Sequence, residues 1–445
     1  MSRDEERGAA GNREGEDVTP RSLRRNVVHA VMGMGVYSAA QLLVTVLLAK
    51  FAGSDVLGSY FYALSLSTPI ILLLGFELRA AFVADVRAEF SFGAYRSARN
   101  AGLLLAAGLL ALLLLRLQRG GADGATLALI AAVFGCKLAW AHAELGWGLF
   151  NRHERLDLMG RATGLRGAAL VIPYAILLPM SAVGWPAKMT PTWSAALASM
   201  IVCGAWSALT LLHDRPGFAR LPRSDASWDW RAVWGVLQRA APLGLVAAAV
   251  NLNDSVPRIF VQERGSAAAL GFFGAVATIP LVAQLIIVQT ANAASNRLSA
   301  YYTHDRPAFH RLFGRLLLLA GGLGALMFGV LAIGAEPILR YAYRAEYVQY
   351  APELRMVATA QVLALFTAVF GCTATQMRVY WPQVPAQAAT LSATTIAAMM
   401  LIPGNPVHGA AVTALIRAGV QFVAYLACVS IGIARRAETG AARKV

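Results

Sequence analysis

Apolar runs of about 20 residues recur along almost the whole chain, separated by short polar segments. A helix needs roughly that length to cross a hydrocarbon core of ~30 Å. The pattern predicts an all-α polytopic membrane protein with about twelve transmembrane helices. The predicted helices cover residues 26–50, 58–80, 100–118, 125–148, 164–182, 193–212, 240–262, 270–296, 313–335, 353–376, 383–403 and 406–433.

The polar segments divide the chain into two halves. Residues 1–25 are polar, mixed in charge and rich in Gly, which is typical of a disordered cytoplasmic tail, and acidic residues among them argue against a signal peptide. A linker at 213–239 separates an N-terminal six-helix lobe (26–212) from a C-terminal six-helix lobe (240–433). Residues 434–445 form a second cytoplasmic tail.

The linker contains an amphipathic pattern. Trp230, Val233, Trp234 and Leu237 follow the spacing i, i+3, i+4, i+7, while Arg231 faces elsewhere. This spacing predicts an interfacial helix that lies on the inner leaflet and joins the two halves. We expect it to act as a membrane anchor.

The charges report topology. The chain has 39 Lys and Arg against 24 Asp and Glu, a formal net charge of +15. These cations alternate between loops and are about three times as frequent on the side of the N-terminus, which predicts that both termini are cytoplasmic in a multi-pass protein of the cytoplasmic (inner) membrane. A nucleic-acid partner would need one basic patch, so none is expected.

Two segments in corresponding places resemble each other. Residues 52–70 read AGSDVLGSYFYALSLSTPI and residues 264–281 read RGSAAALGFFGAVATIPL, each with a Gly-Ser turn, a Leu-Gly pair and a later proline. Six helices per half make the repeats parallel, related by an axis along the membrane normal. Two bundles around a central cavity are the plan of an alternating-access transporter; chance similarity between Gly- and Ala-rich segments is the competing interpretation.

Arg417 lies in the middle of the last helix, with Thr413 and Gln421 one turn away on either side. A charge at the bilayer centre costs about 2.5–3.5 kcal/mol on insertion scales, so it faces a cavity or a partner. Either an acid from another helix pairs with Arg417, or its guanidinium binds a phosphate of the substrate. The planar fork of arginine suits bidentate phosphate binding and favours the second interpretation.

The fourth predicted helix carries a stripe that begins at Lys137 and continues with Trp140, Glu144 and Trp147. One interpretation is a buried ion pair with packed tryptophans. The other is a cationic cavity in which Lys137 binds the substrate and the tryptophan rings stack on sugars. His142 lies off the stripe by roughly 140°, and it is either a proton switch or an ordinary buried histidine.

The stretch NLNDSVPRIF places Asn251, Asp254 and Arg258 on one face of the seventh helix. Asp254 and Arg258 are spaced for an i, i+4 pair, and Pro257 predicts a kink. Arg258 falls in the outer third of the span, so we interpret the stretch as a kinked, self-paired outer gate. Arg258 remains a further candidate to hold an anionic substrate.

Weaker candidates complete the predicted site. Glu77 and Arg79 close the second helix at the inner boundary, where they either snorkel to water or form an inner gate. Amides in two later helices either hold helices together or bind sugar hydroxyls. These amides are Gln284, Asn292, Asn296, Gln383 and Gln387.

The sequence offers no support for an enzyme. It contains no HExxH, Walker loop, CxxC or nucleotide-binding glycine fingerprint in context. The four cysteines fall in apolar runs, where they act as small hydrophobic residues. We therefore expect no catalytic residues, no cofactor and no metal.

Four stretches taken in order resemble polysaccharide and O-antigen flippases of the multidrug, oligosaccharidyl-lipid and polysaccharide exporter superfamily. They are LLAKFAGSDVLGSYFYAL, NDSVPRIFVQERGSAAALGFFGA, EPILRYAYRAEYVQYAPELRMVA and NPVHGAAVTALIR. The resemblance implies twelve helices in two lobes, no covalent chemistry, and translocation of an undecaprenyl-diphosphate-linked oligosaccharide from the inner to the outer leaflet. Its partners would be the polyprenyl-diphosphate-linked glycan, the bilayer, and a polysaccharide polymerase or glycosyltransferases.

We therefore predict a lipid-linked oligosaccharide flippase whose cavity holds the diphosphate on Arg417, Lys137 and Arg258. Two rival functions stay open. A cation-coupled drug or metabolite exporter of the same superfamily would be expected to have acids in its first helix, and residues 26–50 contain none. A non-transporting scaffold for a polysaccharide synthase complex would not need an unpaired cation such as Arg417.

Overall fold

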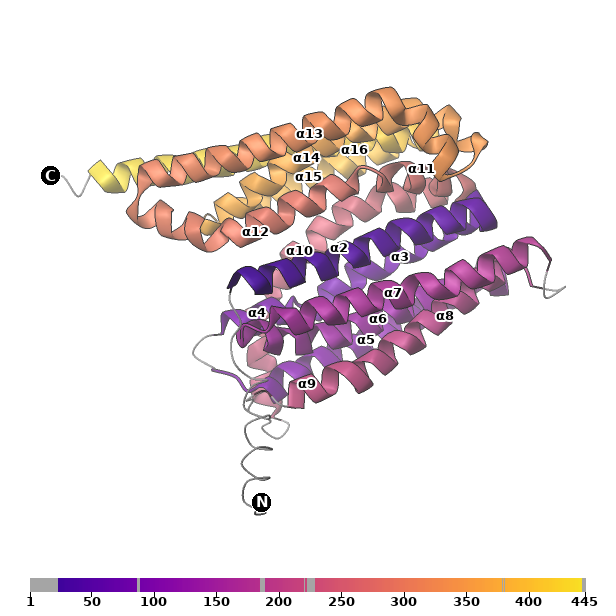
Figure 1. Ribbon diagram of the computed structural model, residues 1–445, viewed down its shortest axis with the longest axis horizontal. Coiled ribbons are helices and arrows are strands. Elements are labelled where there is room, and N and C mark those ends of the chain that lie inside the picture. The colour runs from indigo at the N-terminus through magenta and orange to yellow at the C-terminus, as the bar shows by residue number, and fades with distance from the viewer. Residues whose placement is uncertain are drawn as a thin grey trace, which may run out of the picture.

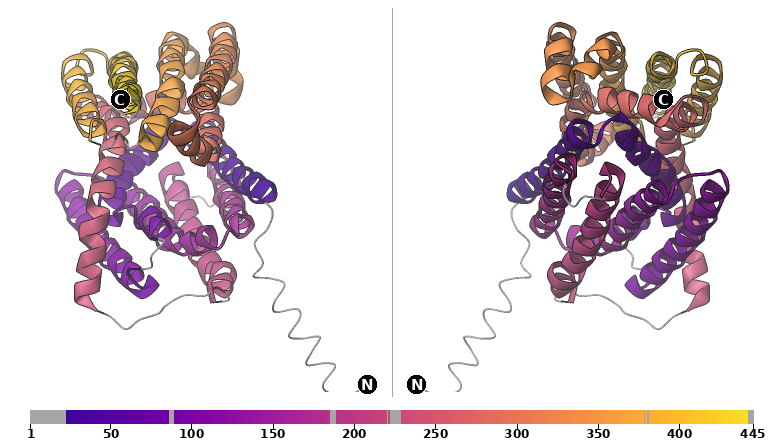
Figure 2. Two further views of the ribbon diagram at one scale, coloured as in Figure 1. Left: turned by 90° about the vertical axis from the view of Figure 1, so that its left-hand side faces the viewer. Right: turned by 90° about the vertical axis from the view of Figure 1, so that its right-hand side faces the viewer.

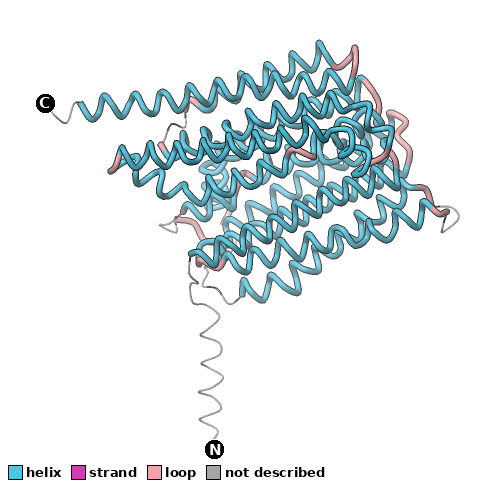
Figure 3. Tube along the Cα trace, turned by 45° about the horizontal axis from the view of Figure 1, so that its top comes forward, coloured by secondary structure: helices cyan, strands magenta, loops and turns pink. Residues whose placement is uncertain are grey.

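A computed structural model describes residues 23–441 of the chain, apart from 86–88, 185–188, 220, 222–228, 378 and 380. Every secondary-structure element in this part is a helix, and short loops join the helices (Figure 3). Ten helices are long and apolar enough to cross a membrane, and two further pairs, each bent at a short break, bring the number to twelve. The predicted all-α fold with about twelve spans is confirmed.

The first half of the chain forms the N-terminal lobe. Several of its helices begin at a side chain that caps the backbone: Ser91, Asp123 and Thr190 each accept a hydrogen bond from a free N–H of the first turn. The elements are α2 (Leu23–Leu47), the π-helix η2 (Leu48–Ala52), α3 (Ser54–Gly75), α4 (Leu78–Ala84), α5 (Phe92–Arg119), α6 (Gly124–Arg152), α7 (Leu156–Ala182), α8 (Pro191–Leu209), the π-helix η3 (Thr210–Asp214) and α9 (Arg215–Ala219).

The second half forms the C-terminal lobe. The predicted helix 270–296 corresponds to two helices, α11 and α12, which meet at 47°. Pro280 lies at the break and has no N–H to continue the helical hydrogen bonds. The elements are α10 (Trp230–Arg264), α11 (Ala267–Thr278), α12 (Leu281–His304), α13 (Arg306–Ala342), η4 (Ala345–Tyr350), α14 (Ala351–Gln376), α15 (Gln383–Leu401) and α16 (Pro406–Ala441).

The predicted interfacial helix is not separate from the seventh span. Both belong to α10, which bends by 48° between Ala241 and Leu243, and the residue at the bend is a proline. Val233 is buried in the N-terminal lobe, whereas Trp230 and Trp234 are exposed. The apolar residues of this segment therefore divide between the protein core and the surface.

The two lobes lie one above the other in Figure 1, and α10 runs along one flank from the level of one lobe to that of the other (Figure 2). Its contacts include α3 and α5 of the first lobe and α15 and α16 of the second. We call the side where α2 begins and α16 ends the terminus side, and the opposite side the far side. The ribbons of the two lobes converge on the far side and run apart toward the terminus side (Figure 1).

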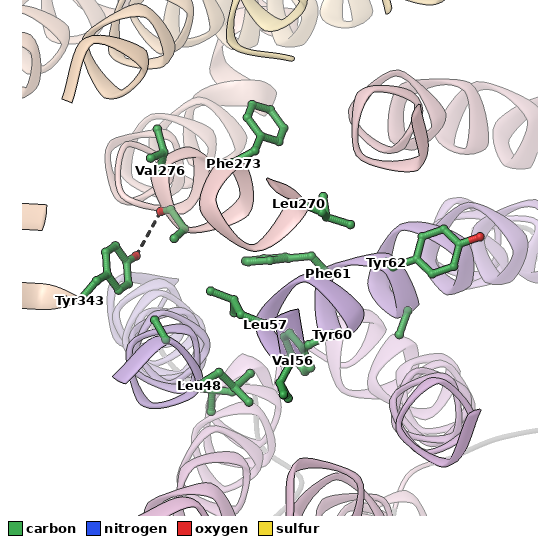
Figure 4. Packing of buried hydrophobic residues seen from close by; sticks show 14 of the residues in the cluster. Leu48, Val56, Leu57, Tyr60, Phe61, Tyr62, Leu270, Phe273, Val276 and Tyr343 are labelled. Atoms are coloured by element: carbon green, nitrogen blue, oxygen red, sulfur yellow. Dashed lines mark hydrogen bonds between the residues drawn. The ribbon is translucent and has the colours of Figure 1, made fainter. Parts of the chain in front are cut away.

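On the far side, the starts of α3 and α11 cross in close contact. A Cβ atom on Gly58 would lie 1.7 Å from the carbonyl oxygen of Ala267, and one on Gly271 would lie 2.0 Å from the carbonyl oxygen of Ser54. These two contacts are equivalent when the Leu-Gly pairs of the two similar segments are aligned. Phe61 lies between the same two ribbons (Figure 4). Reciprocal packing of this kind is expected for repeats related by a two-fold axis, and it requires glycine at both positions.

Candidate functional site

A cavity of about 470 Å³ lies between the two lobes, lined by residues of α3 and α6 from one and of α10, α11, α12, α14, α15 and α16 from the other. We call it the interlobe cavity. It brings together most of the residues predicted to bind substrate and part of the predicted gate. These are Lys137, Asn251, Asp254, Pro257, Arg258, Arg417 and Gln421.

The described lining of the interlobe cavity is cationic. Its charged side chains are Lys137, Arg258 and Arg417 against one acid, Asp254, which gives a formal charge of +2. Lys137 comes from the N-terminal lobe and the two arginines come from the C-terminal lobe. Cations buried among membrane-spanning helices are costly unless they meet an anion, so this lining suits an anionic ligand.

Arg417 and Asp254 form an ion pair across α16 and α10, so the acid from another helix that the sequence left as one of two interpretations is present. The predicted pairing of Asp254 with Arg258 is therefore wrong: a partner 163 positions away in the chain takes the carboxylate in place of the one four residues on. The Arg417 side chain is 22% exposed and that of Asp254 is 51% exposed. The Nε of Arg417 is buried and has no hydrogen-bond partner in the described part of the chain, so the guanidinium has a donor to spare.

Arg258 lies close to the far-side crossing of the lobes. Its guanidinium carbon is 5.6 Å from the ring centroid of Phe61 in α3, which is within the range of a cation–π contact. Pro257 lines the cavity beside it but does not produce the sharp bend of α10, which lies at position 242. Asn251 donates through Nδ2 to the carbonyl oxygen of Ala247, 3.0 Å away.

Amide side chains join helices around the interlobe cavity. Gln361 Nε2 donates to Gln284 Oε1 at 3.1 Å, which links α14 to α12. Asn253 Nδ2 donates to Gln387 Oε1 at 3.0 Å, and Gln387 Nε2 donates to the hydroxyl oxygen of Tyr425 at 2.7 Å. For these amides the structure shows the helix-joining use that the sequence left open.

Three other predicted polar residues lie elsewhere. Gln383 donates through Nε2 to the carbonyl oxygen of Val379, 2.8 Å away. Asn292 is an exposed residue of α12 outside the cavity lining. The side chain of Asn296 lies outside the described residues.

The tryptophan stripe of α6 packs inside the N-terminal lobe. The rings of Trp140 and Tyr37 have centroids 4.4 Å apart, those of Trp140 and Trp147 are 4.9 Å apart, and Trp206 joins the same cluster. Trp147 is 2% exposed, and its indole Nε1 donates to Asp214 Oδ2 at 3.2 Å. The predicted stripe therefore contributes Lys137 to the interlobe cavity, whereas Trp140 packs against the core.

Of the two predicted inner-gate residues, Arg79 pairs within its own lobe with Glu144, which the sequence placed among the substrate-binding residues. Arg79 Nε lies 3.4 Å from Glu144 Oε1, an ion pair between α4 and α6 of the N-terminal lobe. Glu77 separates α3 from α4 with a φ of 49°, a left-handed conformation that is uncommon for residues other than glycine. Phe76 shares this conformation, so the predicted helix 58–80 is interrupted there.

His142 lies in a second cavity that sequence reasoning missed. This cavity has a volume of about 1160 Å³ and lies between α5, α6, the end of α8, η3 and α9. Arg96, Arg99 and Arg215 also line it. Two arginines spaced i, i+3 near the start of α5 are the signal in the sequence that points to this cavity; as loop charges they also report topology.

Comparisons with known proteins agree on the fold. No family model matches the chain. The capsular polysaccharide biosynthesis protein CapF of Staphylococcus aureus is 20% identical over 393 residues, which cover 86% of this chain and 93% of that protein.

Three solved structures have the same architecture. Lipid II flippase MurJ in an inward closed conformation aligns with a TM-score of 0.67 and 12% identity over 91% of this chain and 87% of that chain. An inward-facing multidrug resistance MATE family transporter of the MOP superfamily aligns with a TM-score of 0.65 and 14% identity over 92% and 98%.

A MOP superfamily transporter from Pyrococcus furiosus, described by the reverse polarity of its binding pocket, aligns with a TM-score of 0.64 and 12% identity over 93% and 95%. These similar structures are transporters, not enzymes. The resemblance found in the sequence is thus confirmed at the level of the fold: the chain is a multi-pass membrane protein with the two-lobed fold of MOP superfamily transporters.

Proposed function

We propose that the protein moves a polyprenyl-diphosphate-linked oligosaccharide across the cytoplasmic membrane for surface polysaccharide assembly. The observation that carries this proposal is the formal charge of +2 in the interlobe cavity, to which both lobes contribute cations. An anionic head group pays heavily to cross hydrocarbon, and a buried cationic cavity lowers that cost. The likeness to the lipid II flippase MurJ supports a lipid-linked substrate, and the likeness to the capsular polysaccharide biosynthesis protein CapF supports a role in polysaccharide assembly.

Arg417 is the central phosphate ligand in this proposal. Its guanidinium pairs with Asp254, and its Nε has no hydrogen-bond partner in the described part of the chain. A diphosphate offers several oxygens, so it can replace the carboxylate and form a bidentate contact. Lys137 and Arg258 then bind the same diphosphate from opposite lobes, which draws the two lobes together.

The rest of the substrate occupies the surroundings of this cationic centre. The glycan lies in the hydrated cavity, where Gln421 and Asn251 offer amide groups, and the polyprenyl chain stays in lipid through a lateral opening between the lobes. The far-side crossing of α3 and α11 is tightly packed in this conformation. With both termini in the cytoplasm, the cavity receives substrate from the cytoplasmic leaflet and releases it after this crossing separates.

A complementation assay tests the assignment. Replacing Lys137 and Arg417 with Ala should stop surface polysaccharide assembly in a strain that lacks the native gene. The matched control replaces Arg311 and Arg315 with Ala, which removes two exposed cations of α13. Membrane abundance is measured for each variant. Normal polysaccharide assembly in the Lys137/Arg417 variant would refute the assignment of this cavity.

A cation-coupled exporter is the second candidate, because MATE family transporters share the fold. The one acid of the described cavity lining, Asp254, is already held by Arg417, which argues against a free cation site there. Drug sensitivity after gene deletion, with an unchanged profile of lipid-linked glycans, would favour the exporter.

A further inference from the structure

The second cavity, which we call the lateral groove, lies on the surface of α6 between α5 and the end of α8. Its residues near the terminus side are polar and cationic: Arg96, Arg215 and His142 are exposed residues of its wall. Deeper along the spans its wall is apolar, with Leu103 and Leu138. At about 1160 Å³ it exceeds the ~300–1,000 Å³ typical of small-molecule sites.

Arg99 is the buried cation of the lateral groove. It is 3% exposed, and its Nε has no hydrogen-bond partner in the described part of the chain. Gly75 packs so closely that a Cβ there would lie 2.7 Å from Nη1 of Arg99. Two acids, Glu144 and Glu77, lie near enough to interact with Arg99 electrostatically. Of these, Glu144 is already engaged by Arg79. Burying a guanidinium with a free donor is costly, and an anion bound in the groove would compensate for it.

The corresponding helices of the C-terminal lobe pack aromatic side chains against one another. In the repeat, α13, α14 and α16 correspond to α5, α6 and α8. There the ring centroids of Phe370 and Phe422 are 5.5 Å apart. The ring of Phe313 lies 6.2 Å from that of Phe370, and the ring of Phe366 lies 6.3 Å from that of Phe422. The described helices of the C-terminal lobe thus pack phenylalanine rings together, whereas those of the N-terminal lobe line the lateral groove with arginines.

We propose that the lateral groove binds an anionic, phosphate-bearing lipid from the leaflet on the terminus side. The phosphate lies against Arg96, Arg99 and Arg215, and one hydrocarbon chain follows the apolar wall. Charge complementarity supports the anion, and the exposed apolar flank supports the lipid: Leu104 of α5 and Leu212 of η3 are 74% and 78% exposed on spans that face the bilayer. A free phosphate would leave the apolar part of the groove empty.

Native mass spectrometry of the full-length protein tests this site with three defined lipids: phosphatidylglycerol, zwitterionic phosphatidylcholine and undecaprenyl phosphate. The Arg96→Gln/Arg215→Gln variant removes two exposed cations of the groove. The Arg311→Gln/Arg315→Gln variant removes two exposed cations elsewhere on the same side. Ser207→Phe narrows the groove without changing its charge, because Ser207 is an exposed residue of its wall.

We expect the wild-type protein and the Arg311/Arg315 control to retain a phosphate-bearing anionic lipid in preference to phosphatidylcholine. The Arg96/Arg215 variant should bind the anionic lipid at least roughly tenfold more weakly, since one lost charge-assisted contact is worth about 1.4 kcal/mol. The Ser207→Phe variant should also lose the bound lipid. Competition between the two anionic lipids identifies whether a bulk phospholipid or the polyprenyl carrier occupies the groove. Equal retention in all variants, or no preference over phosphatidylcholine, would overturn the proposal. Neither result depends on flipping activity.

Discussion

The ion pair between Arg417 and Asp254 makes an unusual prediction: removing an acid should tighten the binding of an anion. Asp254→Asn is nearly isosteric and changes the formal charge of the described interlobe cavity lining from +2 to +3. In the wild-type protein the diphosphate must displace the carboxylate from Arg417. In the variant the diphosphate meets an Arg417 guanidinium that is not paired with a carboxylate.

The exposure of the two side chains sets the magnitude. At 22% and 51% exposed, the pair lies between a surface pair, worth about 0.2–1 kcal/mol, and a buried pair, whose disruption costs about 3–5 kcal/mol. We expect the displacement to cost about 1–2 kcal/mol. Its removal should tighten diphosphate binding roughly five- to thirtyfold.

Isothermal titration of purified protein with geranylgeranyl diphosphate, a short and soluble probe, measures this effect. Asp254→Asn should lower Kd, whereas Arg417→Gln should raise it, because it removes the ligand itself. Thermal unfolding of both variants controls for loss of structure. A weakening of binding by Asp254→Asn as large as that caused by Arg417→Gln would show that the pair is structural and would refute this reasoning.

Two further predictions concern a helix crossing and a buried ion pair outside the lining of the interlobe cavity. Gly271→Val should push α11 away from Ser54 and increase thiol labelling of an Ala267→Cys reporter from the far side. The control Gly35→Val, which has open space around it, should not increase the labelling. Unchanged labelling in the Gly271→Val variant would contradict the role of this crossing as a seal. Asp214→Ala should destabilise the purified protein by about 3–5 kcal/mol, since it leaves the fully buried Arg166 without the partner 2.7 Å away. The Arg166→Met/Asp214→Leu double variant should regain part of the lost melting temperature, since the indole N–H of Trp147 still loses its acceptor. Equal melting temperatures of the single and double variants would argue against the pair.

The number and type of spans followed from the sequence because hydropathy reports transfer into lipid, which each segment undergoes largely on its own. The cavity cations Lys137, Arg258 and Arg417 were also predicted from the sequence, because a charge within a span must face a cavity or a partner.

The contacts that these polar and aromatic side chains make could not be predicted from the sequence. Asp254 was assigned to Arg258 by the local i, i+4 rule, but a contact between α10 and α16 prevailed. Trp140 was placed on the same face as Lys137, yet the crowding of Tyr37, Trp147 and Trp206 makes it part of a core. Such outcomes depend on which helices are neighbours, and periodicity carries no information about that.

The lateral groove was missed for a related reason. Arg96 and Arg99 lie at the start of a span, where arginines ordinarily snorkel to water. The burial of Arg99 becomes visible only when the positions of α3, α5 and α6 are known. The break at Pro280 could be suspected from the residue type, but its angle of 47° could not.

The central claim is that this cavity carries a lipid-linked oligosaccharide across the membrane. Its most direct test is to delete the gene and identify, by mass spectrometry of extracted lipids, which intermediates accumulate and on which leaflet they remain accessible to an impermeant probe. The account predicts accumulation of an undecaprenyl-diphosphate-linked oligosaccharide that stays protected on the cytoplasmic leaflet. An unchanged lipid profile, with the glycan still exposed on the outer leaflet, would contradict it.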